Sequence, residues 1–85
     1  MADRTLGKLW QAADGLHIDV RGLQPPEPMV AILQQIEKPE AGDVVIVHHF
    51  CEPIYLYPEL AERGWSHEII PGDPGEVRLI LKRQR

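Results

Sequence analysis

The spacing of hydrophobic residues changes several times along this chain, and each change marks an expected element. Residues 16–20 alternate between apolar and polar, which predicts a strand with one buried face. Residues 25–38 carry an apolar stripe at helical spacing, with prolines at its start and Pro39 at its end. This pattern predicts a helix, because proline is tolerated in the first turn and not in the interior. Residues 43–49 are apolar without alternation, which predicts a strand covered on both sides, at least in part.

The second half of the chain predicts one more helix and a pair of strands. The helix is expected to begin near residues 55–57, because Pro58 must lie in its first turn. Gly64 suits the C-terminal end of that helix. Residues 65–70 and 76–82 are strand-like, and the turn sequence "PGDPG" lies between them. We therefore expect an antiparallel hairpin at the C-terminal end.

The N-terminal segment shows a different spacing. Its apolar residues fall at i, i+3, i+4 and i+7, which predicts a short amphipathic helix over residues 4–13 that Gly15 ends. These residues are Leu6, Leu9, Trp10 and Ala13. So short a helix is marginal alone. We expect an N-terminal helical arm, residues 1–14, that packs on the body or on a partner, and a domain over residues 15–85.

The order of elements after the arm is β-α-β-α-β-β. A right-handed crossover would make the first two strands parallel. We predict an α/β fold of the two-layer α+β sandwich type, with two helices on one face of a four-stranded mixed sheet. The opposite face would then be open. We expect charged side chains over part of it, and the arm or a second copy of the chain over the apolar remainder. These charged candidates are His17, Asp19, Arg78 and Lys82.

Composition narrows the classes of function. The chain has 85 residues, 44% of them hydrophobic and 26% charged, which suits one small folded domain. Nine basic and thirteen acidic residues give a net charge of −4, which disfavours nucleic acid as a partner in spite of a basic C-terminal tail. Cys51 is the one cysteine, so no internal disulfide can form. No apolar run approaches membrane-spanning length. We expect a cytoplasmic protein.

The segment "LHIDVRGLQPPEP", residues 16–28, resembles the signature of the TusA/SirA-like sulfur-carrier family. Gly22, Leu23, Pro26 and Pro28 match that signature, and Pro25 stands where the family carries its persulfide cysteine. The chain is similar to a TusA-like domain family of unknown function that has proline at this point and a later segment like "EPIYLYPELAERGW". The resemblance covers about residues 16 to 82.

This resemblance implies a fold more than an activity. Pro25 has no sulfur and no backbone N–H, so persulfide transfer from that residue is chemically impossible. We expect a binding or adaptor domain that is not an enzyme and has no cofactor. By family association, it would act in redox, sulfur or respiratory metabolism, with a hemerythrin-like or redox protein as partner. A homodimer through the open face or the arm is a second expectation.

The candidate site follows from topology. The carboxyl ends of two neighbouring parallel strands lie at the same edge of a sheet, so the loop "HHFCEP" should emerge near "RGLQPP". The expected binding residues are Arg21, Gln24, Glu27, His48, His49, Cys51 and Glu52. The alternative for Arg21 is a surface ion pair with Asp19 or Glu27.

Cys51 has two interpretations. It could be a displaced sulfur carrier, with His48 or His49 as its base, or a small inert hydrophobic residue. A metal site is not predicted, because adjacent strand residues point to opposite faces and His67 lies on another strand. We expect one of His48 and His49 to be buried and the other solvated. Trp10 could anchor a partner.

Overall fold

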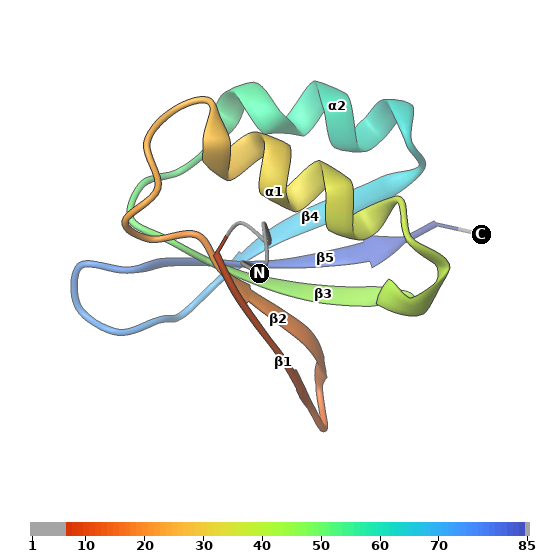
Figure 1. Cartoon of the computed structure of the whole chain (residues 1–85), viewed down its shortest axis with the longest axis horizontal. Coiled ribbons are helices and arrows are strands. Elements are labelled where there is room, and N and C mark those ends of the chain that lie inside the picture. Colours follow the sequence, from red (N-terminus) through yellow and green to blue (C-terminus); the bar gives the residue numbers. More distant parts are fainter. Residues whose placement is uncertain (1–6, 85) are drawn as a thin grey trace, which may run out of the picture.

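The computed structural model describes residues 7–84 as a five-stranded mixed sheet with two helices along one face (Figure 1). The sheet has the order β1-β2-β3-β5-β4. Its strands are β1 (Lys8–Ala12), β2 (Gly15–Asp19), β3 (Val44–His49), β4 (Trp65–Ile70) and β5 (Val77–Arg83). The helices are α1 (Glu27–Ile36) and α2 (Tyr57–Glu62), with short 3-10 turns at η1 (Pro39–Ala41) and η2 (Ile54–Leu56). The predicted α+β class and the helices on one face are confirmed.

Strand pairing follows the predicted topology after the first strand. β2 and β3 are parallel, and α1 lies in the connection between them. β4 and β5 form the expected antiparallel hairpin, and β3 pairs antiparallel with β5. Across the middle of the sheet, Ile18 lies opposite Val47 and Val47 lies opposite Leu79. The central strands therefore bring apolar side chains of distant segments onto one face.

The hydrophobic core fills the space between that face and the helices. Each fully buried Leu, Ile or Val contributes roughly 1.5–3 kcal/mol relative to an exposed position. Its fully buried side chains include Ile18, Ile32, Ile36, Val47, Leu56, Leu60, Leu79 and Leu81, all with at most 1% of their surface exposed. The apolar spacings of the sequence correctly predicted this side of the molecule.

The helix boundaries have identifiable causes. Pro26 directly precedes α1, and Pro28 lies in its first turn, where a missing N–H costs nothing. Glu27 opens the helix at the positive end of its dipole. Gly64 follows α2 with a φ of +79°, a conformation that glycine adopts readily. The predicted beginning of the second helix is also confirmed, because η2 runs directly into α2.

The predicted N-terminal helix is wrong over the residues that the structure describes. β1 pairs antiparallel with β2, and Ala12 lies opposite Gly15, so the hairpin turn has only two residues. A Cβ on Gly15 would lie 2.8 Å from the Val44 carbonyl oxygen, so only glycine fits. As a strand, the segment pairs with the free edge of β2, whereas a short isolated helix has little to stabilise it. The described part of the arm thus adds a fifth strand; residues 4–6 of the predicted helix lie outside the described residues.

The two faces of the sheet carry alternate residues of each strand. Along β3, Val45, Val47 and His49 lie on the side of the helices, whereas Ile46 and His48 lie on the opposite face. That face, which we call the open face, carries no helix of residues 7–84 (Figure 1). Neither α1 nor α2 has the length and apolar character that a membrane crossing requires.

Candidate functional site

The two loops predicted to form a site do emerge together. The backbone N–H of Val20 donates to the carbonyl oxygen of His48 at 3.0 Å, which continues the parallel pairing past the end of β2. The segment 21–26 and the segment 50–53 therefore start side by side at one edge of the sheet (Figure 1). We call this region, extended to residue 55, the loop edge: it comprises residues 21–26 and 50–55.

At the loop edge, Arg21 is engaged in a surface ion pair. Its Nε and Nη2 atoms donate to the two carboxylate oxygens of Asp19 at 3.0 and 2.8 Å. The hydrogen bond from the Arg21 side chain is the main reason that the pKa of Asp19 lies below its usual value. Gln24 and Glu27 are also exposed. The structure thus shows an ion pair between Arg21 and Asp19, which was the predicted alternative to a binding role for Arg21.

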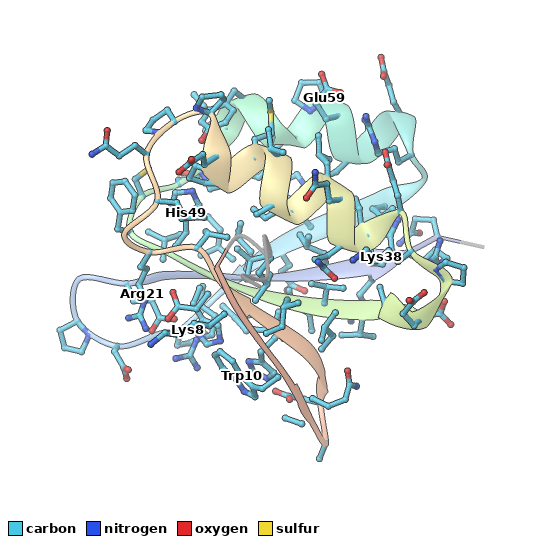
Figure 2. All side chains as sticks on the ribbon, in the orientation of Figure 1. Lys8, Trp10, Arg21, Lys38, His49 and Glu59 are labelled. Atoms are coloured by element: carbon cyan, nitrogen blue, oxygen red, sulfur yellow. The ribbon has the colours of Figure 1, made fainter. Side chains whose placement is uncertain are left out.

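His49 lies on the side of the helices, near the start of α1 (Figure 2). Its Nδ1 atom accepts hydrogen bonds from the backbone N–H groups of Phe50, at 2.9 Å, and Cys51, at 3.3 Å. The hydrogen of the neutral ring is therefore on Nε2, which is buried and has no hydrogen-bond partner within residues 7–84. Burial lowers the pKa of His49. This ring is a structural acceptor for the loop backbone.

Cys51 is exposed, with its Sγ atom 3.9 Å from Nδ1 of His49. The lone pair on that nitrogen already receives two backbone donors, which weakens His49 as a base for the thiol. The neighbouring Glu52 carboxylate accepts a hydrogen bond from the Tyr57 hydroxyl at 2.9 Å. Burial, with this bond added, raises the pKa of Tyr57 to about 12. Glu52 therefore connects the loop edge to α2.

Large apolar side chains are also exposed at the loop edge. Phe50 is 51% exposed, Ile54 is 65% exposed and Tyr55 is 44% exposed. They flank Cys51 in sequence and lie in or next to an irregular segment. The sequence pattern did not single out Phe50 and Ile54, although apolar residues outside any strand or helix period are a detectable signal.

A second cluster lies on the open face and joins two imidazole rings. Nδ1 of His17 lies 2.8 Å from Nε2 of His48. The outer nitrogen of His17, Nε2, lies 2.8 Å from the Asp14 carboxylate. The outer nitrogen of His48, Nδ1, lies 2.5 Å from the Glu76 carboxylate. The result is a hydrogen-bonded chain of two carboxylates and two imidazoles across β2 and β3.

The Glu76 end of this chain is held firmly. Its carboxylate accepts two hydrogen bonds from Arg78, at 3.1 and 2.9 Å, and one from the backbone N–H of Asp73 at 2.8 Å. Its side chain is only 1% exposed. The Arg78 bonds are the main reason that the pKa of Glu76 falls to about 2. At the other end, the hydrogen bond from His17 lowers the pKa of Asp14. Both carboxylates are therefore ionised acceptors at neutral pH.

Trp10 covers the imidazole pair from β1. Its ring centroid lies 5.0 Å from that of His17 and 5.2 Å from that of His48. Figure 2 shows Trp10 on the hairpin, on the side of the sheet away from the helices. The indole is 42% exposed, so one surface of it still meets solvent. Trp10 thus packs against residues of its own domain, and its role as a partner anchor stays a prediction.

The prediction for the two adjacent histidines is half right. His48 and His49 do point to opposite faces of the sheet, but neither is solvated, with 6% and 1% exposure. His67 stacks on Tyr57 at 3.6 Å on the helix side and so lies apart from His48. Within residues 7–84, no group of three or more His, Cys, Asp or Glu side chains is placed to hold a metal ion. The contact between His17 and His48 could not be predicted from the sequence, because it depends on the register in which β2 and β3 pair.

The fold and these two clusters define a small α+β domain with polar and aromatic side chains concentrated at one sheet edge and on the open face. Residues 17–83 match the model of the family DUF2249, described as an uncharacterized conserved protein, and the chain belongs to that family. No curated protein matches the chain.

Proposed function

We propose that this domain is a non-catalytic binding or adaptor module that contacts a protein partner through the loop edge. The observation that carries the proposal is the exposure of Phe50, Ile54 and Tyr55 in one short segment. Aromatic and large aliphatic side chains that are exposed together are the usual anchors of protein interfaces.

The surroundings of these residues indicate the chemistry of the partner. Glu27 and Glu52 border the loop edge with negative charge, and the whole chain carries a net charge of −4. A partner segment with apolar side chains and flanking lysine or arginine residues complements both features. The site is therefore proposed for a basic, partly apolar segment of another protein, and nucleic acid is the poorer match.

The resemblance to sulfur carriers gives the proposal its metabolic setting. Gly22, Leu23, Pro26 and Pro28 match the carrier signature, whereas Pro25 replaces the persulfide cysteine. A TusA-like scaffold without that sulfur retains a surface for partners of redox, sulfur or respiratory metabolism in the cytoplasm. A hemerythrin-like protein is the partner that this association favours.

The test compares the loop edge with another exposed apolar side chain of the sheet. Phe50→Ser with Ile54→Ser alters the loop edge, and Ile69→Ser is the control, because Ile69 is 53% exposed on the edge strand β4. A partner captured by the wild-type chain is purified and its affinity for each protein is measured by calorimetry. We expect at least a tenfold loss for the double variant and no change for the control. Equal affinities for all three proteins would contradict the proposal.

A thiol or sulfur carrier that uses Cys51 is the second candidate. The favouring observation is the exposed Sγ atom 3.9 Å from His49 Nδ1. Incubation with a persulfide donor, followed by mass measurement of the wild type and of Cys51→Ser, separates the candidates. One added sulfur atom on the wild type alone, which a thiol acceptor then removes, supports the carrier. The adaptor proposal expects no transferable sulfur.

A further inference from the structure

We infer that His17 and His48 form a binding site for a late first-row divalent metal ion, such as Cu²⁺ or Zn²⁺, on the open face of the sheet. The inference does not depend on the proposed function, because the two imidazole rings lie on the open face and not among the exposed apolar residues of the loop edge.

The outer nitrogens of the pair face ionised carboxylates. Nε2 of His17 must carry a hydrogen to bind Asp14, and Nδ1 of His48 must carry one to bind Glu76. In two neutral rings, the inner nitrogens are then both bare lone pairs, and they face one another at 2.8 Å. Such an arrangement is repulsive unless a positive species lies between the two nitrogens. A shared proton fits the observed distance, and a metal ion is the other species that two converging imidazole lone pairs attract.

The carboxylates are placed as they are behind metal-binding histidines. A ligating imidazole usually donates its second N–H to a carboxylate, which sets its tautomer and makes the other nitrogen more basic. Here both rings have this support, one from Asp14 and one from Glu76. Glu76 is further held by Arg78 and the Asp73 backbone, so its ring is locked in orientation. The structure thus presents two preoriented nitrogen ligands.

Trp10 is an independent observation that points to a cation. Its indole lies at nearly equal distances, 5.0 and 5.2 Å, from the two imidazole centroids, so it covers the place where the inner nitrogens meet. The face of an indole ring attracts positive charge more strongly than that of any other side chain. An aromatic cover over converging lone pairs favours occupation by a cation.

Only a small movement is needed to admit a metal ion. With metal–nitrogen bonds of about 2.0–2.1 Å and a tetrahedral angle, two nitrogen ligands lie about 3.3 Å apart. The observed separation is 2.8 Å, and small side-chain rotations supply the difference. The metal displaces the shared proton to solvent. The protein offers two ligands, so water or a group from another molecule must complete the coordination. It would reach the metal past the edge of the Trp10 ring, which is 42% exposed.

The experiment titrates CuCl₂ and, separately, ZnCl₂ into the full chain and follows binding by calorimetry and copper quenching of indole fluorescence. Every protein carries Cys51→Ser, because an exposed thiol is itself a metal ligand. His17→Gln and His48→Gln remove the ligands, and His67→Gln is the matched control on the edge strand. We expect one bound metal per chain, tighter for copper than for zinc. Each ligand variant should lose at least tenfold in affinity, and the control should lose none.

Two further variants keep the test decisive if a ligand variant fails to fold. Asp14→Asn changes a carboxylate that is 64% exposed in a turn, and it should weaken metal binding by roughly 10–100-fold. Trp10→Phe should abolish most of the copper-dependent quenching, because the other tryptophan, Trp65, is buried on the helix side. Absence of binding at millimolar metal, or equal affinity in the His17, His48 and Asp14 variants, would overturn the inference.

Discussion

The two faces of this sheet are built from alternate residues of the same strands, yet they are stabilised in different ways. On the helix side, Val47 and Leu79 pack in an apolar core with no measurable exposure. On the open face, their neighbours His48 and Arg78 take part in a chain of hydrogen bonds through Glu76. Stabilisation by buried apolar area depends little on the exact geometry of the contacts. A buried chain of polar groups is stable only if each donor and acceptor in it has a hydrogen-bond partner. One face is a core, and the other is a candidate site.

The largest expected effect on stability comes from truncating a core side chain on the helix side of the sheet. Leu79→Ala should lower the free energy of unfolding by about 2–5 kcal/mol, because it leaves a cavity among fully buried side chains. Ile80→Ala changes the next residue of β5, which lies on the open face and is only partly buried. Its cost should be clearly smaller. Urea unfolding of both variants measures the difference, and equal losses would show that the open face is as tightly packed as the core.

The second effect concerns the polar chain of the open face. Glu76→Gln keeps the shape of a buried side chain but removes the charge that accepts bonds from Arg78 and His48. A hydrogen bond to a charged group contributes roughly 1.5–3 kcal/mol, so we expect a loss in that range. Glu68→Gln, an exposed carboxylate on β4, serves as the control and should stay within about 0.5 kcal/mol of wild type. If Glu76→Gln left the free energy of unfolding unchanged, the hydrogen-bonded chain of the open face would contribute nothing to folding.

The contrast between the apolar core and the polar open face also explains which parts of the fold could be predicted from the sequence. The strand β2 and the helix α1, which begins at prolines, were predictable because apolar spacing reports directly on burial. The first strand was not, because the apolar spacing of residues 4–13 fits a helix as well, and the tight turn before Gly15 decides between them.

The polar site was even less accessible from the sequence. His17 and His48 are 31 residues apart, and they meet only because β2 and β3 pair in parallel in one particular register. The loop edge was predictable as a place, since parallel strands end together. Its apolar character came from Phe50 and Ile54, which belong to no periodic pattern.

A third prediction uses a titrating group on the helix side. The pKa of Tyr57 is raised to about 12, chiefly by burial, so its neutral form is favoured in the folded chain. In the unfolded chain a tyrosine ionises near pH 10. The resulting stability is fully present below about pH 10 and is lost as the pH rises toward 12. Phenolate absorbance should show one late-titrating tyrosine that Tyr57→Phe removes; a Tyr57 that ionises with an ordinary pKa would contradict this account.

The smallest expected effect compares two arginine–carboxylate pairs of the open face and its edge. Arg21 pairs with Asp19, and both are partly in water, with 43% and 17% of their side chains exposed. A pair this exposed to water contributes little to stability, so Arg21→Ala should shift the urea midpoint little. Arg78→Ala should cost more, because it leaves the Glu76 carboxylate, 1% exposed, without its main partner. If Arg21→Ala proved as costly as Arg78→Ala, burial would not be what separates the two pairs, and the loop edge would depend on Arg21 for its shape.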